Sequence, residues 1–234
     1  MNWLAKSWQR LNDATIGKES YWTIAVQNYS IYRDTCPLIG RHIGGNTLDV
    51  GAGNLAWKQA LQTRCASYVS SDFTIVNQQL DLVFDVTRPF PLKSGSFDSL
   101  FCHSVLEHTV RPWDAFAELH RVLDDGGTLL LSVPFIFYLH GAPFDFFRFT
   151  RHGITRLAED AGFRVESLVL NGGMFHFILN MPSVIISSLF FSLHCAFLIP
   201  IVTKLLSACA RFLDSKLDKA GIFAMNIVCV LKKD

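Results

Sequence analysis

Acidic residues, glycines and a serine stand at the ends of short apolar segments in the first half of the sequence. They are Asp49, Gly51, Gly53, Asp72, Asp85 and Ser104. Carboxylates accept hydrogen bonds from hydroxyls and amines and attract a positive charge, and a glycine lets a ligand approach the backbone closely. These residue types therefore predict a site for a ligand that carries hydroxyls, an amine and a positive centre.

A second group of residues has the chemistry to act on an acceptor molecule. His140 is followed by Asp145 and Arg148, and His108 and His103 come earlier in the chain. A histidine titrates near neutral pH and can accept the proton of a hydroxyl, so we expect His140 first, and then His108, to be the catalytic base. Arg148 either binds an acidic acceptor or pairs with Asp145 and stiffens the loop. For any single histidine, a purely structural role is the alternative.

The segments that carry these residues alternate between short apolar runs and amphipathic stretches, which is typical of a βαβ protein. Strands are predicted at 47–50, 67–71, 82–84, 99–103, 128–133, 163–170 and 222–231. Helices are predicted at 55–61, from Pro112 to Gly126-Gly127, and from Ile154 to Gly162. In a doubly wound sheet ligands bind beyond the carboxyl ends of the strands, so the polar residues should converge on one crevice. S-adenosylmethionine (SAM) has the three features that this crevice requires.

The predicted fold class is therefore α/β, with a Rossmann-like, doubly wound sheet of seven mostly parallel strands. Residues 1–45 are expected to form an N-terminal helical cap, and residues 46–234 the domain that carries the site. A hydrophobic helical insertion is expected at about 176–213, before the last strand.

The composition excludes several classes of protein. The chain has 234 residues, of which 50% are hydrophobic and 18% charged, and its formal net charge is +1. It is too apolar for a disordered chain, and the charge balance speaks against nucleic acid as a partner. The six cysteines are scattered, so we expect reduced, buried thiols. Lys6, Arg10 and Asp13 interrupt the N-terminal apolar residues, so we expect no signal peptide and a cytoplasmic protein.

A long apolar segment lies near the C-terminus. Residues 167–203 include no Asp, Glu, Lys or Arg, a run of 37 residues. We expect its helix to start at Pro182 and to stop at Pro200, which leaves about 25 Å, short for a full membrane crossing. Serines at positions 183, 187, 188 and 192 predict close packing on another helix.

Basic residues follow this apolar segment, among them Lys204 and Arg211. Basic groups beside an apolar surface are attracted to anionic head groups, so the sequence favours peripheral contact with the inner face of a membrane. The alternatives are a helix buried in a soluble enzyme and the contact surface of a homodimer.

Six short segments occur in a characteristic order. They are LDVGAGN (48–54), SSDF (70–73), FDVTRPFPL (84–92), SFDSLFCHSVLEHTVRP (96–112), RVLDDGGTLLLSVPF (121–135) and AGF (161–163). Together they resemble the class I SAM-dependent methyltransferases, specifically the small-molecule enzymes of type 11, over roughly residues 46–175. The segment HGAPFDFFRFT (140–150) resembles a subgroup associated with polysaccharide and surface-glycan biosynthesis.

This resemblance implies how the crevice would hold SAM. The turn from Asp49 to Gly53 would hold the methionine part, and Asp72 would hold the ribose hydroxyls. Phe73 would cover one face of the adenine and Asp85 would bind its amine. Ser104 would line the far side of the site. The last strand is expected to be antiparallel to its neighbour.

The reaction implied is methyl transfer from SAM, which we expect to go to oxygen of a glycan, a lipid-linked saccharide or another small acceptor. In such an in-line displacement the protein chiefly supplies alignment and a dry pocket, so no metal is expected.

Two other functions are compatible with parts of the sequence. Gly51-x-Gly53-x-x-Ala56, with Asp72 further on, fits the dinucleotide fingerprint and would indicate an NAD-dependent oxidoreductase. Leu55 stands where the methyltransferases usually have a third glycine, which makes a membrane-associated binding module without turnover a second alternative.

Overall fold

The computed structural model describes residues 3–75 and 77–234 of the chain. The chain divides into two compact units. The first contains the residues up to Thr35 together with Leu170–Met225, and the second contains Cys36–Val169 together with Asn226–Asp234. The domain division expected from the sequence, with a cap at 1–45 and a catalytic domain at 46–234, stays a prediction.

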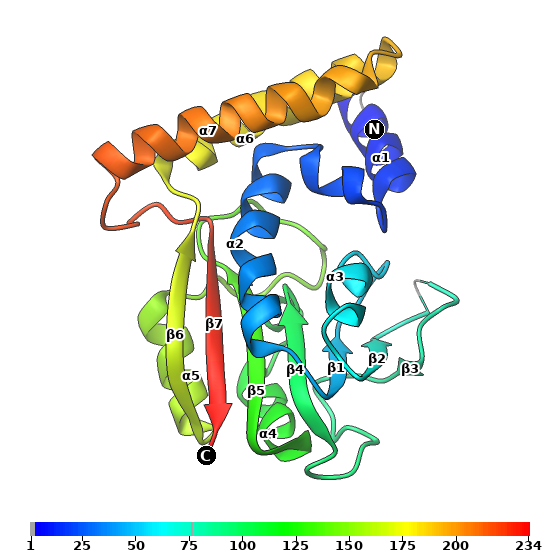
Figure 1. Cartoon of the computed structure of the whole chain (residues 1–234), viewed down its shortest axis with the longest axis vertical. Helices are drawn as coiled ribbons and strands as arrows, with labels where there is room; N and C mark the ends of the chain where they lie inside the picture. The colour runs from blue at the N-terminus through cyan, green and yellow to red at the C-terminus, as the bar shows by residue number, and fades with distance from the viewer. Residues whose placement is uncertain (1–2, 76) are drawn as a thin grey trace. The chain divides into compact units, whose positions relative to one another are not determined.

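The second unit is built on a seven-stranded sheet with the order β3-β2-β1-β4-β5-β7-β6 (Figure 1). The strands are β1 (Asn46–Val50), β2 (Ser67–Asp72), β3 (Leu82–Val83), β4 (Phe97–His103), β5 (Leu123–Pro134), β6 (Phe163–Asn171) and β7 (Asn226–Lys233). The pairs β1–β2, β1–β4, β2–β3 and β4–β5 are parallel, and β5–β7 is antiparallel. The predicted Rossmann-like fold and the antiparallel last strand are therefore confirmed.

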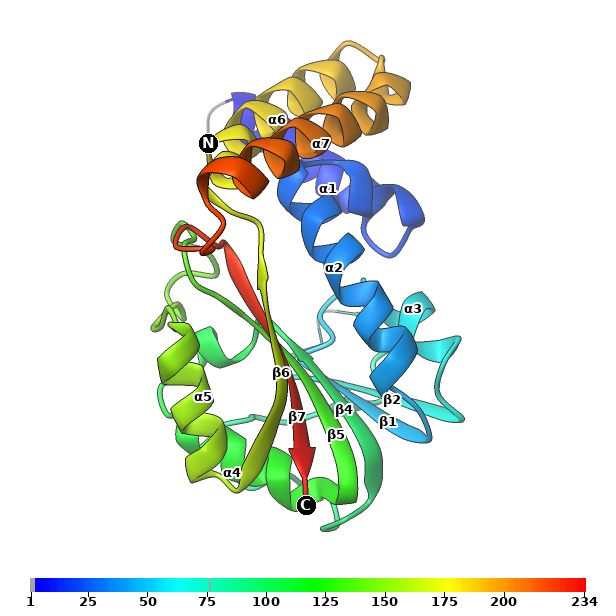
Figure 2. The ribbon, with the colours of Figure 1, turned by 60° about the vertical axis from the view of Figure 1, so that its left-hand side comes forward.

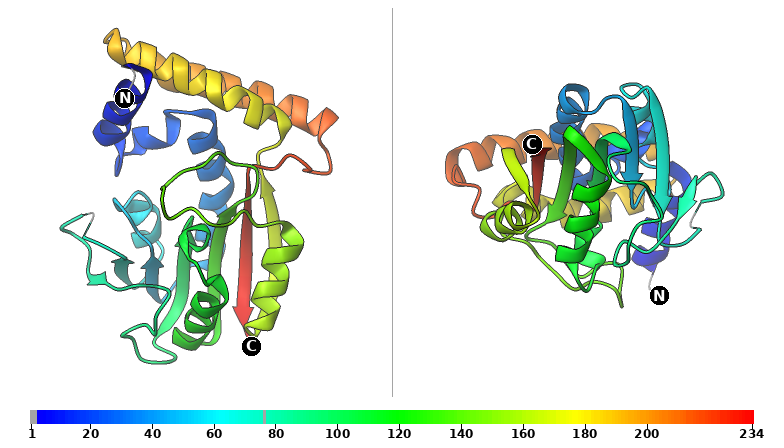
Figure 3. Two further views of the ribbon diagram at one scale, coloured as in Figure 1. Left: turned by 180° about the vertical axis from the view of Figure 1, so that it is seen from behind. Right: turned by 90° about the horizontal axis from the view of Figure 1, so that it is seen from below.

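Helices cover both faces of this sheet. α4 (Pro112–Val122) and α5 (Arg151–Asp160) lie on one face, and α3 (Lys58–Gln62) lies on the opposite face with the end of α2 (Val26–His42) (Figures 1 and 3). Because both faces are covered, the central strands are apolar on both sides, and residues 128–133 and 226–231 are buried throughout. The hydrophobic core therefore lies on both faces of the central strands.

Three predicted boundaries in this unit are wrong. α3 begins at Lys58 rather than residue 55, because Leu55 has a φ of 61° and lies in a turn. α4 ends at Val122, and Gly126 lies inside β5, where the pairing with β4 is irregular between Phe97 and Ser99. The last strand begins at residue 226 rather than 222, because the preceding residues form a turn.

The first unit is helical. It contains α1 (Trp3–Thr15), η1 (Glu19–Thr23), the start of α2, α6 (Met174–Ser192), η3 (Ala196–Leu198) and α7 (Ile199–Leu217). α6 and α7 lie side by side and are joined by a short connection, so they form a helical hairpin (Figures 1 and 2). The hydrophobic helices predicted before the last strand are therefore present.

α6 starts eight residues before the predicted position, and Pro182 lies inside it. Carboxylates from the C-terminal end of the hairpin cap its first turn: Asp214 accepts the backbone N–H groups of Phe175 at 2.7 Å and His176 at 3.3 Å. Asp218 accepts the N–H of Met174 at 3.2 Å. These acceptors satisfy donors that a helix cannot satisfy itself, and their negative charge suits a helix N-terminus.

Serines of α6 pack against α1 and against the start of α2, as their spacing predicts. The Ser7 hydroxyl donates to the carbonyl of Ser188 at 2.8 Å and lies 2.8 Å from the Ser192 hydroxyl. The Ser183 hydroxyl accepts the N–H of Val26 at 3.1 Å. Small side chains on both helices allow this close approach.

All six cysteines are free thiols. Only Cys102 and Cys229 are buried, Cys209 is exposed, and the other three are partly buried. The expectation that all six thiols are buried is therefore wrong for four of them.

Candidate active site

The turn after β1 has a backbone that brings two segments of the chain close together. Gly51 and Gly53 have φ values of 72° and 52°, which favour glycine. A Cβ atom on Gly51 would collide with the side chain of Val105. Leu55 also has a positive φ, so it holds a conformation that glycine would adopt more easily, and its side chain is buried. The turn therefore keeps its glycine-like geometry at the position where the third glycine is missing.

Asp72 ties the end of β2 to this turn. Its two carboxylate oxygens accept the N–H groups of Gly53 at 2.8 Å and Phe73 at 2.7 Å. Asp85, after β3, accepts the backbone N–H of Thr87 at 2.9 Å and the hydroxyl of Thr87 at 2.7 Å. Each carboxylate is thus held rigidly at a strand end.

A cavity of about 620 Å³ opens at these strand ends. Of the residues predicted from the sequence, it brings together Gly51, Asp72, Phe73, Asp85, Ser104 and His108. Asp49, Gly53, His140, Asp145 and Arg148 are not among its lining residues. Ser104 has a φ of 54°, an uncommon conformation for a residue other than glycine, and such positions often occur at functional sites.

Asp49 is buried in β1, just before the turn. Its carboxylate accepts a hydrogen bond from the Tyr68 hydroxyl at 2.7 Å. Burial raises the pKa of Asp49 to about 7, although the Tyr68 hydrogen bond acts in the opposite direction, and the negative charge of Asp72 raises the pKa further. Asp49 is therefore a buried residue of β1 directly before the turn, and it does not line the cavity.

The raised pKa of Asp49 predicts a pH dependence of stability. The folded state holds the proton of the Asp49 carboxyl more tightly than the unfolded state, so the stability that Asp49 contributes is fully present below about pH 4 and is lost as the pH rises through about 7. The upper bound of the loss is about 4 kcal/mol, from 1.36 kcal/mol per pKa unit. Denaturant unfolding should show that the free energy of unfolding falls less between pH 5 and pH 8 for Asp49→Asn than for the wild type. Equal losses in both proteins, or the same reduction in the exposed control Asp160→Asn, would contradict the assignment.

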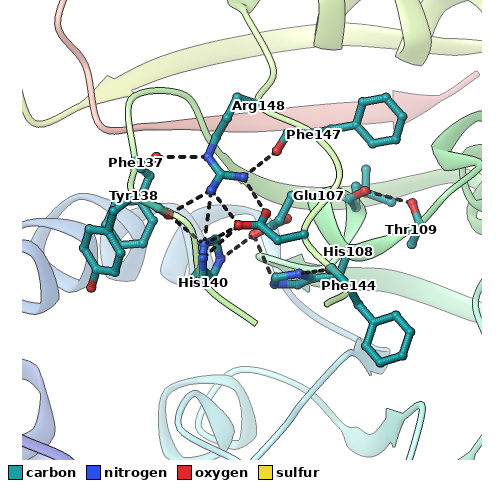
Figure 4. Close-up of polar contacts among 11 residues, drawn as sticks. Glu107, His108, Thr109, Phe137, Tyr138, His140, Phe144, Phe147 and Arg148 are labelled. Carbon is teal, nitrogen blue, oxygen red and sulfur yellow. Dashed lines mark hydrogen bonds and ion pairs between the residues drawn. The ribbon is translucent and has the colours of Figure 1, made fainter. Parts of the chain in front are cut away.

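Glu107 lies beside His108 and His140, the two histidines expected to act as the catalytic base. Its side chain is fully buried, and its Oε1 lies 3.5 Å from His140 Nε2 and 3.8 Å from His108 Nε2 (Figure 4). Glu107 raises the pKa of His140, whereas burial opposes this shift. The sequence analysis missed Glu107, although a charged residue directly before the candidate base His108 was an available signal.

Arg148 and Asp145 form the framework of the loop that follows β5. Arg148 donates to both oxygens of Asp145, at 2.6 and 2.8 Å, and to the backbone carbonyls of Phe137, Tyr138 and Phe147 (Figure 4). These five bonds use every N–H of the guanidinium. The Arg148 charge holds the pKa of Asp145 well below its usual range. Of the two roles expected for Arg148, pairing with Asp145 is the one present here.

His103, the third histidine considered as a base, lies apart from this group. Its ring packs against those of Trp57 and Phe101, and burial lowers its pKa to about 4. It is therefore neutral at physiological pH and does not line the cavity.

The residues of the cavity fit SAM. Apolar side chains, among them Phe73, Val86 and Val105, line most of it, while Asp72 and Asp85 place carboxylates at its edge. This combination suits an adenine ring, ribose hydroxyls and a positively charged centre. The fold and the site together define a class I SAM-dependent methyltransferase, with SAM as its cofactor.

The comparison with known proteins agrees with this class. Residues 48–131 match the type 11 methyltransferase family, whose description is "Methyltransferase domain". The matched segment includes the turn after β1, both carboxylates of the cavity and the Glu107–His108 pair. No curated protein sequence matches the chain significantly.

Several solved structures share the fold. The cyclase SpnF is 16% identical, with a TM-score of 0.58, over 86% of this chain and 80% of its own. A SAM-dependent methyltransferase from Archaeoglobus fulgidus is 11% identical, with a TM-score of 0.57, over 86% and 91%. Phosphoethanolamine N-methyltransferase 2 from Haemonchus contortus, in complex with SAM, is 14% identical, with a TM-score of 0.57, over 97% and 60%. At these identities the likeness is one of fold, which does not specify the acceptor.

Proposed function

We propose that this methyltransferase transfers the methyl group to oxygen, on a glycan, a lipid-linked saccharide or another small acceptor. The observation that carries the proposal is that His108 lines the cofactor cavity, with His140 and Glu107 directly beside it. A hydroxyl must lose its proton when it is methylated, and such a transfer needs groups that handle a proton or stabilise the oxygen anion. The resemblance of residues 140–150 to glycan-modifying enzymes supports the acceptor class.

The residues divide into two groups in this proposal. SAM, when bound, supplies an electrophilic methyl group. Asp72 and Asp85 hold its polar groups, Phe73 and Ser104 line its walls, and the turn from Asp49 to Gly53 shapes its floor. His108 and His140 activate the acceptor oxygen. Asp145 and Arg148 keep the loop after β5 in position, because the hydrogen bonds of Arg148 connect the start of this loop to its end.

The test uses SAM with a labelled methyl group and fractions of cell extract that contain glycans or lipid-linked saccharides. We expect label in the saccharide fraction as a base-stable methyl ether. Asp72→Ala should transfer little label, whereas the exposed control Asp160→Ala should transfer as much as the wild type. Label found only as base-labile ester, or on nitrogen, would refute transfer to a hydroxyl.

A titration with S-adenosylhomocysteine, with NAD in parallel, separates the alternatives. The methyltransferase should bind S-adenosylhomocysteine and not NAD. Binding of NAD alone would indicate an oxidoreductase. If S-adenosylhomocysteine binds but no acceptor is ever methylated, the chain is a binding module without turnover.

We also propose that the helical hairpin contacts a membrane peripherally. The described residues contain two helices, Met174–Ser192 and Ala196–Leu217, that are long and apolar enough to cross a membrane, with only 28% and 22% of their apolar windows buried. Their burial pattern is the opposite of that in a helix of a soluble protein, which buries its apolar face and exposes its polar face. The buried residues of α6 are His176, Asn180, Ser183, Ser187 and Ser188.

Large apolar side chains lie on the outside of the same helices. They are Ile178, Met181, Ile185 and Leu189 on α6, and Ile201, Leu205 and Phe212 on α7. An exposed apolar surface of this kind, flanked by Lys204, Arg211 and Lys216, suits insertion among the acyl chains and anionic head groups of a bilayer. Contact with lipid would also bring the enzyme to a lipid-linked acceptor.

Flotation with anionic liposomes tests this contact. The wild type should float with the vesicles, and the double variant Ile185→Glu/Leu205→Glu should remain in the soluble fraction, because two buried aliphatic side chains contribute roughly 3 kcal/mol or more. Ile75→Glu, on an exposed apolar residue of the other unit, is the matched control and should float. If the wild type stays soluble and forms a dimer that the double variant breaks, the surface is a protein interface instead.

A further inference from the structure

Glu107 is a buried carboxylate that has no neutralising partner at hydrogen-bond distance. Its side chain has an exposed fraction of 0%, and neither of its oxygens has a hydrogen-bond partner among the described residues. A carboxylate in this environment is costly unless a positive charge or hydrogen-bond donors compensate it. The cationic groups within ion-pair distance of it are the imidazoles of His108 and His140, at 3.8 and 3.5 Å.

Both imidazoles are oriented by contacts on the opposite side of their rings. His108 Nδ1 lies 2.6 Å from the carbonyl oxygen of Phe144, and His140 Nδ1 lies 3.3 Å from that of Tyr138 (Figure 4). A carbonyl accepts only an N–H, so the neutral His108 ring carries its proton on Nδ1. His140 Nδ1 also lies 3.5 Å from the Arg148 guanidinium, which is a donor. The lone pair of His108 Nε2 is then free on the side of Glu107, and His140 Nε2 lies 3.5 Å from the same carboxylate oxygen. Metal-binding histidines likewise donate their other ring N–H to a backbone carbonyl.

We propose that Glu107, His108 and His140 bind a divalent transition-metal ion. Their three ligand atoms lie within 4.8 Å of one another. Ligands at 2.0–2.2 Å from a tetrahedral ion lie about 3.4 Å apart, so the two histidine–carboxylate distances nearly fit, and no pair of ligand atoms needs to close by more than about 1.4 Å. Two imidazoles and one carboxylate suit Zn²⁺, Fe²⁺ or Co²⁺ rather than Mg²⁺, which prefers oxygen ligands.

Three protein ligands leave a coordination position open, as catalytic metal sites do. His108 lines the cofactor cavity, so the open position lies near the place where an acceptor would meet the methyl donor. This role rests on the proposed function. An acceptor hydroxyl bound to the ion would become more acidic and release its proton to water, and the new C–O bond would form as the C–S bond breaks with its electron pair left on sulfur.

The first experiment titrates the purified, chelator-treated protein with Co²⁺, by calorimetry and visible absorption. We expect one-to-one binding, with ligand-field bands and without the intense absorption of thiolate ligands. Glu107→Gln and His140→Asn should each weaken binding roughly 100-fold or more, since loss of even a second-shell partner costs 10- to 100-fold. His152→Ala, which removes an exposed histidine outside the cluster, is the matched control and should bind like the wild type.

S-adenosylhomocysteine binding and the unfolding midpoint are measured on every variant to confirm that it folds. Absence of stoichiometric Co²⁺ binding in a folded wild type would overturn the metal site, and the histidines would then act directly as bases. Thiolate absorption, or binding that survives both substitutions, would overturn it equally. Co²⁺ binding without S-adenosylhomocysteine binding would support the metal site and refute the proposed methyltransferase function. Failure of the metal site and failure of the proposed function therefore give different results.

Discussion

Asp72→Ala is expected to weaken S-adenosylhomocysteine binding about 100-fold. Hydrogen bonds to a charged group contribute roughly 1.5–3 kcal/mol, and the alanine removes the carboxylate assigned to the ribose hydroxyls. It also removes the acceptor of the Gly53 and Phe73 N–H groups, so the turn after β1 loses its link to β2. Both effects weaken the affinity for S-adenosylhomocysteine, and a calorimetric titration measures their sum.

Two further variants show whether the effect belongs to the site. Asp72→Asn keeps one oxygen acceptor and should fall between the wild type and Asp72→Ala. Asp160→Ala removes a carboxylate that is 55% exposed on α5 and should leave the affinity unchanged. An Asp72→Ala protein that folds and binds S-adenosylhomocysteine as tightly as the wild type would refute the assignment of Asp72 to the cofactor.

Asp145→Ala is expected to lower the free energy of unfolding by about 2 kcal/mol, because it removes the carboxylate of a partly buried ion pair and leaves the Arg148 charge without its partner. The Asp145 side chain is 1% exposed and that of Arg148 is 26% exposed. Asp145 also accepts the N–H of His140 at 2.8 Å, so the loop loses the contact that places this histidine. Denaturant unfolding measures the loss of stability.

Arg156 and Asp160 provide the matched control for this prediction. They form an ion pair on α5 in which the side chains are 74% and 55% exposed. Solvent screens such a pair, so Asp160→Ala should cost at most about 1 kcal/mol. If Asp145→Ala costs no more than Asp160→Ala, and protease cleavage within residues 135–149 is not accelerated, the pair does not hold the loop.

Much of the fold was predictable because the relevant signals are local. The segments before Gly51 and Asp72 were predicted to be strands because each is short and is followed by a turn residue. The glycines at 51 and 53 were informative for a similar reason, since their positive φ values are a requirement of the turn itself. Strands that run parallel must end at the same edge, so the strand-end residues Asp72, Asp85 and Ser104 were expected to meet and do so.

Other features depend on contacts between distant residues. The start of α6 at Met174 is set by Asp214 and Asp218, which are about forty residues away and cap its first turn. Leu55 keeps a conformation typical of glycine because its side chain is buried, which no pattern in the neighbouring sequence indicates. The guanidinium of Arg148 has no free donor only because three carbonyls of the same loop turn toward it.

The sequence by itself determined the class of fold, the strand ends that carry the candidate cofactor residues and the glycine turn after β1, because these follow from periodicity and from the backbone preferences of single residues. Only the tertiary structure decided which histidine lines the cavity, that Glu107 lies between His108 and His140, and that the hairpin presents its apolar side chains outward. Those features depend on burial, and the burial of a side chain is a property of everything packed around it.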